Sequence, residues 1–231
     1  MENNILYEDN HIIVIEKLPG DIVQGDKTGD LSLLDEIKNF LKIKYNKPGN
    51  VYLGLVHRID RPVGGVLIYA KTSKAASRLS KLMQTDDVKK TYLAVTYKKP
   101  SQDSGTLIHY LYKNEKQNKS YALDEHSSTK IINQKKAKKA ILNYKYIGSS
   151  LRYHLLEIDL ITGRHHQIRC QLASIGCVIK GDLKYGAPRS NEDASISLWA
   201  NKLEFKHPVK NEIIKIKSTP KFYGLELQDF K

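Results

Sequence analysis

The chain has 231 residues, of which 40% are hydrophobic and 27% are charged. This composition is typical of a globular protein and excludes a disordered tail, a collagen-like repeat and a disulfide scaffold. No apolar run approaches the roughly 18 residues of a membrane-spanning helix, so we expect none. Lysine and arginine number 38 against 25 aspartates and glutamates, a net charge of +13. This excess favours a polyanionic partner, above all a nucleic acid.

The first half of the chain predicts a hairpin, two helices and two further strands. Ser32 is placed to cap the first helix, and a cluster of turn-forming residues at 46–50 ends it. The second helix carries its small and apolar residues on one face. In chain order we expect hairpin strands at 5–7 and 12–15, a helix over 33–41, strands over 51–56 and 66–70, and a helix from Thr72 or Ser73 to Met83.

The second half predicts more strands and a single helix. A polar, lysine-rich stretch covers 98–139, and Gly176 is placed to end the helix. We expect strands over 91–97, 106–112 and 121–123, a hairpin of 141–147 and 153–161, a helix through 168–175, and strands near 178, 195–200 and 212–217. Many strands with few, unevenly spaced helices predict an α+β fold with a largely antiparallel sheet and flanking helices. We expect one domain over residues 1–231.

Cysteine use and the N-terminal segment indicate the cellular compartment. Cys170 and Cys177 are the only cysteines, and no CxxC pair is present. This spacing is not that of a zinc site or a disulfide framework. Residues 1–9 lack a basic patch followed by an apolar stretch, so they predict no signal peptide. We therefore expect reduced thiols in a cytoplasmic protein.

Residues 57–61, His-Arg-Ile-Asp-Arg, place one carboxylate between two guanidinium groups. Neighbouring positive charges keep the Asp60 carboxylate ionised, and an ionised, partly desolvated carboxylate can act as a nucleophile. Gly64 and Gly65 follow, and glycines there permit a close approach of a ligand or an unusual turn. The alternative interpretation is a solvated charged loop at the end of a strand.

Residues 162–169, Thr-Gly-Arg-His-His-Gln-Ile-Arg, lie between a predicted strand and a predicted helix. Adjacent residues of a helix point about 100° apart, so His165 and His166 are poorly placed to chelate one metal ion. Helical zinc ligands usually stand four residues apart. The segment instead indicates a cluster of donors for a polyanion, with one arginine turned inward to a carboxylate.

A third segment, Lys89-Lys90-Thr91-Tyr92, opens a predicted strand. Alone it is weak evidence, because a tyrosine there normally serves packing and the lysines form a solvated strand end. It becomes informative in company with the two segments above.

Together these segments resemble the RluA-type RNA pseudouridine synthases. The stretch His57 to Lys71 resembles that family's His-Arg-Leu-Asp motif, which leads into glycine, an apolar strand and Ala-Lys. The resemblance extends over residues 5–220. Its further motifs, in chain order, are Lys17 to Gly20, Lys90-Thr91-Tyr92, Thr162 to Arg169, Gly181 to Gly186 and His207-Pro208.

The sequence departs from the family pattern at four places. Leu18 stands where proline is usual, and His165 stands where threonine is commoner. Val63-Gly64-Gly65 replaces Thr-Ser-Gly, and Leu198-Trp199-Ala200 replaces a frequent Leu-His-Ala. None of these changes removes a catalytic residue, so they bear on the contacts around the base.

The resemblance implies an enzyme that isomerises uridine to pseudouridine in ribosomal or transfer RNA, on the pseudouridine synthase catalytic fold, without cofactor or metal. It implies that Asp60 is the nucleophile, that Arg164 pairs with it, and that Tyr92 stacks on a flipped base. The chain is expected to be a short member without a separate N-terminal RNA-binding domain, and no oligomeric state is implied. RNA contacts are expected from Arg58, Arg61, Lys89, Lys90, His166 and Arg169.

Two other functions compete with this interpretation. One is a metal-dependent RNA phosphodiesterase that uses His57, Asp60, His165 and His166, which would be sensitive to chelators. It needs further carboxylates nearby, and residues 162–169 contain none. The other is a non-catalytic RNA-binding module, which would tolerate loss of Asp60.

Overall fold

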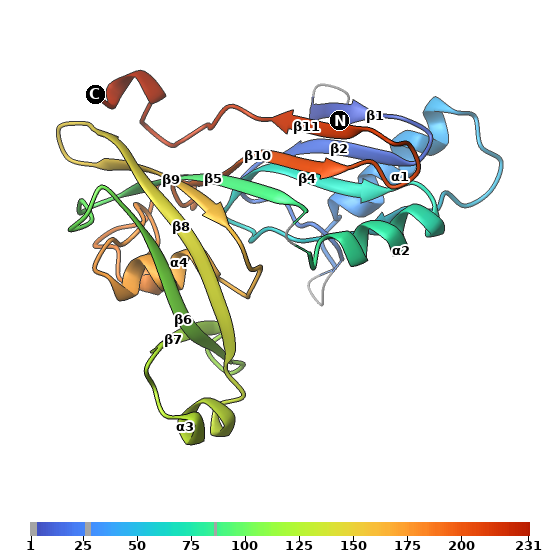
Figure 1. The fold of residues 1–231 in the computed structure, drawn as a ribbon. Coiled ribbons are helices and arrows are strands. Elements are labelled where there is room, and N and C mark those ends of the chain that lie inside the picture. Colours follow the sequence, from blue (N-terminus) through green and yellow to red (C-terminus); the bar gives the residue numbers. More distant parts are fainter. Residues whose placement is uncertain (1–3, 26–28, 86) are drawn as a thin grey trace. The chain divides into compact units, whose positions relative to one another are not determined.

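The computed structural model describes residues 4–25, 29–85 and 87–231 of the chain. The chain divides into two compact units (Figure 1). Unit 1 comprises Met1–Lys89 and Ala200–Pro220, and unit 2 comprises Lys90–Trp199 and Lys221–Lys231. Because the chain passes between the units three times, neither is a continuous stretch. The single domain expected over residues 1–231 stays a prediction.

Unit 1 is built on antiparallel strands in the order β1-β2-β4-β10, with β3 paired to β4 and β11 paired to β10. The pairs β1–β2, β2–β4, β3–β4 and β10–β11 are antiparallel. β4 is buried along its whole length, as expected for a strand flanked on both edges. The strands are β1 (Ile5–Glu8), β2 (Ile12–Lys17), β3 (Gly54–Leu55), β4 (Gly64–Ala70), β10 (Leu198–Lys206) and β11 (Ile213–Lys217).

Two capped helices belong to unit 1. α1 (Leu33–Lys44) begins after Ser32, and α2 (Ser73–Leu82) begins after Thr72. Each cap side chain accepts a hydrogen bond from a backbone N–H in the first turn, which satisfies a donor that the helix leaves unpaired. Ala75 and Leu79 of α2 pack into the core formed by apolar residues of β2, β4 and β10.

Unit 2 contains a second set of antiparallel strands, in the order β5-β9-β8-β6-β7. α4 packs against β6 and β7. The core there joins Leu111 and Ala140 to Cys170 and Tyr185. The elements are β5 (Lys89–Thr96), β6 (Ser104–Asn114), β7 (Lys119–Asp124), α3 (Thr129–Gln134), β8 (Lys138–Ser149), β9 (His154–Leu160), α4 (Gln167–Ser174) and the short 3₁₀ helices η2 (Leu183–Tyr185) and η3 (Leu227–Asp229).

The predicted α+β class with a largely antiparallel sheet is confirmed. The strand expected over 51–56 is wrong in extent, because β3 covers only Gly54–Leu55. β2 and β10 already flank β4, so β3 pairs only with the last two residues of β4. The strand expected near 178 is reduced to a single bridge between Thr96 and Ile179. α3 was not expected, since its six residues show no apolar periodicity. None of the described helices is long and apolar enough to cross a membrane.

Candidate active site

The Asp60 segment forms a short loop between β3 and β4 in unit 1. Ile59 and Val63 are buried and anchor its two sides, whereas Asp60 is half-buried. The carbonyl of Asp60 accepts a hydrogen bond of 3.0 Å from the backbone N–H of Val63, which closes a tight turn. The sequence thus places the carboxylate on a turn fixed by apolar side chains at both ends.

A buried lysine holds the backbone of this loop. Lys17, at the end of β2, has no exposed surface, and its Nζ donates to the carbonyls of Leu18, Arg61 and Val63 at 3.0, 3.0 and 2.7 Å. Burial lowers the pKa of Lys17 to about 8, although the negative charges of Asp21 and Asp60 act in the opposite direction. The side chain therefore satisfies three carbonyls and lies in the electrostatic field of the candidate nucleophile.

The segment after Lys17 also fixes the loop. The backbone N–H of Gly20 donates to the Arg61 carbonyl at 2.8 Å, and Arg61 Nε donates to the Gly20 carbonyl at 3.1 Å. Lys17 to Gly20 and residues 57–63 thus form one interlocked structure. Two motifs that are separated by about forty residues in the sequence build a single site.

His57 and Gly65 have structural roles in this part of the chain. Nε2 of His57 accepts a hydrogen bond of 3.3 Å from the backbone N–H of Ile68. Gly65 has a φ of +120°, and a Cβ there would lie 2.3 Å from the carbonyl oxygen of Ala200. At Gly65 the close approach is therefore an approach of the protein's own backbone, which admits no larger residue.

The Arg164 segment, between β9 and α4 in unit 2, is held by neutral side chains. Oε1 of Gln167 accepts from Thr162 Oγ1 at 2.8 Å and from the backbone N–H of Arg164 at 3.0 Å. Its Nε2 donates to the Ile141 carbonyl at 3.0 Å. Arg164 itself is exposed, and its Nε donates to the Lys139 carbonyl at 3.0 Å.

The two histidines of this segment stack on each other. Their ring centroids lie 3.8 Å apart with planes inclined by 21°. Nδ1 of His165 lies 2.9 Å from Ser120 Oγ, and Nδ1 of His166 lies 3.1 Å from the hydroxyl of Tyr185. Imidazole lone pairs lie in the ring plane, so two parallel rings do not converge on one ion. Within residues 4–25, 29–85 and 87–231, no group of three or more His, Cys, Asp and Glu residues is arranged for a metal.

Arg169 requires a correction, because it was expected to contact RNA. It is 5% exposed, and its Nε and Nη2 donate to the Asp182 carboxylate at 2.7 and 2.8 Å. Its guanidinium also lies 5.1 Å from the ring centre of Tyr185. The buried partners leave Arg169 facing the protein interior. Within unit 2, Arg169 is thus the arginine of this segment that turns inward to a carboxylate. Its contact with Asp182 joins α4 to residues 181–186.

The other candidate residues are distributed over both units. Tyr92 lies in β5 of unit 2 and is 8% exposed. Lys89 is exposed, with its Nζ 3.5 Å from Glu204, and Lys90 is half-buried. Arg58 and Arg61 are exposed. Asp60 belongs to unit 1, whereas Tyr92 and Arg164 belong to unit 2, so the predicted Asp60–Arg164 ion pair stays a prediction.

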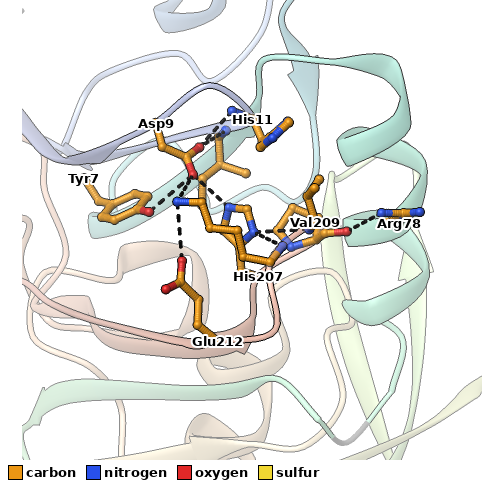
Figure 2. A network of polar contacts seen from close by, with 10 residues as sticks. Tyr7, Asp9, His11, Arg78, His207, Val209 and Glu212 are labelled. Atoms are coloured by element: carbon orange, nitrogen blue, oxygen red, sulfur yellow. Dashed lines mark hydrogen bonds and ion pairs between the residues drawn. The ribbon is translucent and has the colours of Figure 1, made fainter.

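The His207-Pro208 motif belongs to a polar network within unit 1, shown in Figure 2. His207 Nε2 lies 2.9 Å from Asp9 Oδ2, and its Nδ1 accepts from the backbone N–H groups of Val209 and Lys210. Burial acts to raise the pKa of Asp9, but hydrogen bonds from backbone N–H groups and nearby positive charges hold it below its ordinary value. Arg78 of α2 donates to the Pro208 carbonyl at 2.8 Å. This motif therefore joins two turns and a helix.

Comparison with known proteins decides the family. The family model described as RNA pseudouridylate synthase matches residues 11–174, which is more than half of the chain. The chain belongs to this family. One relative is the Bacillus subtilis protein YhcT, which is named as an uncharacterized RNA pseudouridine synthase. It is 30% identical to this chain over 92% of the chain and 67% of its own length.

Two further relatives support the assignment. A ribosomal large subunit pseudouridine synthase C of Rickettsia bellii is 36% identical over 79% of the chain and 56% of its own length. The solved structure of human RNA pseudouridylate synthase domain containing 4 covers 96% of the chain and 90% of its own length, with 25% identity and a TM-score of 0.77. The chain thus spans roughly half to two thirds of the length of the curated relatives that it matches.

Proposed function

We infer that this chain is an RNA pseudouridine synthase that isomerises uridine within RNA. The observation that carries this proposal is the Asp60 loop. Its backbone is fixed by Lys17, Gly20 and Arg61, and it presents a half-buried carboxylate in a chain of this family. A rigid backbone around a nucleophile supports catalysis because the reacting group is already oriented. The net charge of +13 suits a polyanionic substrate.

The reaction breaks the N-glycosidic bond, turns the uracil and joins its C5 to C1′. In our proposal Asp60 is the nucleophile and Arg164 pairs with it. Tyr92 stacks on the base and accepts or relays the proton lost from C5, while Arg58 occupies the gap left in the RNA. The base must leave its stack to reach the carboxylate. No step requires a cofactor or a metal ion.

Phosphate contacts are proposed from the exposed or half-buried cations among the predicted residues. Arg58, Arg61, Lys89 and Lys90 remain in this group, together with His166. We propose cytoplasmic ribosomal or transfer RNA as the substrate. The name of the Rickettsia bellii relative refers to the ribosomal large subunit and favours the ribosomal alternative. Pseudouridine mapping of total RNA from cells without this protein identifies the modified site as the one that disappears.

The decisive experiment replaces Asp60 by Asn, which is nearly isosteric but cannot form an ester-like bond to the nucleoside. We expect pseudouridine formation to fall by several orders of magnitude, about the range seen when a nucleophile is lost. Affinity for RNA is expected to persist, because phosphate contacts and stacking supply it. The measurement is tritium release from RNA that contains C5-labelled uridine, run beside a binding assay.

Asp21→Asn is the matched control, because both carboxylates act on the charge of Lys17. Asn at position 21 still accepts the hydrogen bond from the backbone N–H of Leu18, so turnover should stay near that of the wild type. Wild-type tritium release by Asp60→Asn would end the assignment of the nucleophile. RNA cleavage by the wild type that stops with chelator would favour the phosphodiesterase instead.

A further inference from the structure

One face of the strands β6, β7 and β8 carries tyrosines and a lysine, and the opposite face packs on α4. Tyr112 pairs directly with Tyr121 across β6 and β7, and Tyr110 pairs with Lys139 across β6 and β8. Directly paired residues and residues two apart share one side of a sheet. We call Tyr110, Tyr112, Tyr121 and Lys139 the tyrosine face.

The opposite side of the same strands is occupied by protein. Leu111 and Ala140 alternate with the tyrosine face and pack with Cys170 of α4. Nε2 of Gln171, also on α4, donates to the carbonyls of Leu107 and Ala140. Core packing thus accounts for one side of the strands, and the tyrosines lie on the other side, where each is half-buried.

The two central tyrosines form an aromatic pair with lysines at its ends. The ring centres of Tyr112 and Tyr121 lie 5.5 Å apart, with planes inclined by 20°. Lys135 Nζ lies 5.3 Å from the centre of the Tyr112 ring, and Lys119 Nζ lies 5.5 Å from that of Tyr121. A contact between an exposed ammonium and an aromatic ring is weak, so the exposed Lys135 side chain gives way readily to a base.

The charge of this part of the chain selects the occupant. Residues 104–139 contain eight lysines against three acidic residues. Figure 1 shows β6, β7 and β8 running together toward α3, which lies within this lysine-rich stretch. Flat aromatic rings among cations are the features by which proteins hold single-stranded nucleic acid, since each base offers a π-face and each phosphate a charge.

The tyrosine face is also connected to the Arg164 segment within unit 2. Arg164 Nε donates to the backbone carbonyl of Lys139, and Lys139 lies directly opposite Tyr110 in the register of β6 and β8. Tyr112 follows two residues after Tyr110 along β6, and Tyr121 lies opposite Tyr112 on β7, so the tyrosine face begins beside the strand residue that Arg164 contacts.

We propose that the tyrosine face binds single-stranded RNA flanking the target uridine, with bases stacked on Tyr112 and Tyr121 and phosphates held by Lys135 and Lys139. This inference rests on the proposed function, because it names how the RNA of that reaction is held. It assigns the stacking to the tyrosines and the charge contacts to the lysines. These two contributions respond differently to salt and to removal of the bases.

The test compares two double variants with controls from the same unit. Tyr112→Leu with Tyr121→Leu keeps apolar bulk but removes the rings, and Lys135→Gln with Lys139→Gln removes two charges. Tyr146→Leu and Lys99→Gln are matched controls, since Lys99 Nζ lies 4.3 Å from the centre of the half-buried Tyr146 ring. The probe is a short uridine-rich single strand and the same strand with abasic residues.

Stacking contributes about 1–3 kcal/mol per base, so the tyrosine variant should bind the uridine strand at least about tenfold more weakly. It should lose the preference for uridine over abasic strand while its salt slope stays unchanged. The lysine variant should flatten the slope of log affinity against log salt by about 1.4, at about 0.7 for each phosphate. The controls should bind like the wild type.

A tyrosine variant that keeps its fold and its preference for bases would overturn the proposal. If that variant fails to fold, the wild type is instead crosslinked to RNA that contains 4-thiouridine. A crosslinking pattern with no crosslink within residues 104–124 would contradict the stacking role. Tritium release is measured in parallel. If the tyrosine variant releases tritium normally and binds RNA like the wild type, the RNA-binding role of the tyrosine face is overturned and the proposed reaction stands. If the wild type releases no tritium but its RNA binding depends on the tyrosines, only the proposed reaction is overturned.

Discussion

Each unit has a deeply buried cationic side chain in one of the motif segments, Lys17 in unit 1 and Arg169 in unit 2. The two side chains are stabilised by different kinds of hydrogen-bond acceptor. Lys17 in unit 1 donates to three backbone carbonyls, whereas Arg169 in unit 2 forms two hydrogen bonds with the Asp182 carboxylate. Carbonyls supply only partial charge, so burial lowers the pKa of Lys17 to about 8. A guanidinium stays protonated in a protein, so Arg169 has no comparable response to pH.

This difference separates a positioning role from a stabilising one. The carbonyls that Lys17 holds include that of Arg61, the residue next to Asp60, so any change at Lys17 reaches the candidate nucleophile directly. Arg169, which lies five residues after Arg164 in the sequence, instead ties α4 to Asp182. We therefore expect perturbation of Lys17 to affect turnover strongly and perturbation of Arg169 to affect mainly stability.

The largest effect on stability is expected from Asp182→Ala. It leaves the Arg169 guanidinium buried without its carboxylate, and loss of one partner of a buried ion pair costs about 3–5 kcal/mol. Urea unfolding followed by circular dichroism measures this change. The control is Asp103→Ala, which removes an exposed pair with Lys99 and should cost at most about 1 kcal/mol. Equal destabilisation by the two variants would contradict the structural role of Arg169.

The sequence predicted the elements that local rules determine. Ser32 predicts the start of α1, and Thr72 or Ser73 predicts the start of α2, because a hydroxyl before an amphipathic stretch caps a helix. The caps are Ser32 and Thr72. The hairpins follow from alternation around polar turns, and β1 pairs with β2 as expected. The motif segments were also predicted, and two of them meet where Lys17 holds the Asp60 loop.

What the sequence could not supply is the choice among similar side chains. Arg164 and Arg169 lie in one segment, yet one is exposed and the other is buried on Asp182. That choice depends on where α4 packs, which no local pattern records. The role of Ser120 was missed for the same reason: it lies in β7, forty-five residues before His165, and only the pairing of distant elements brings the two together.

The second effect in size is expected from Lys17→Met. The carbonyls of Leu18, Arg61 and Val63 each lose a hydrogen bond from the Lys17 ammonium, and a lost hydrogen bond to a charged group costs about 1.5–3 kcal/mol. The carbonyls of Leu18 and Arg61 keep the backbone N–H groups of Asp21 and Gly20 as donors, which reduces the total. Release of a buried charge offsets part of this, so the net loss should be about 2–4 kcal/mol. Pseudouridine formation by the folded fraction should fall at least about tenfold, since small misplacements of a nucleophile are costly. Turnover equal to that of the wild type would remove Lys17 from the positioning role.

The smallest effect is a pH dependence that only the lysine site should show. The folded pKa of Lys17 is about 8 and its ordinary value is 10.5, so the unfolded chain binds more protons on this group between these values. Stability from Lys17 therefore rises with pH, by about 2 kcal/mol between pH 8 and 10. Urea unfolding of the wild type and of Lys17→Met across this range isolates the contribution, because the two chains share all other titratable groups. The difference between the two free energies of unfolding should grow with pH. A difference that stays constant would show that Lys17 is not held in its charged form against the cost of burial.

The Arg169 site serves as the internal contrast, because the change in the free energy of unfolding caused by Asp182→Ala should be the same at pH 8 and at pH 10.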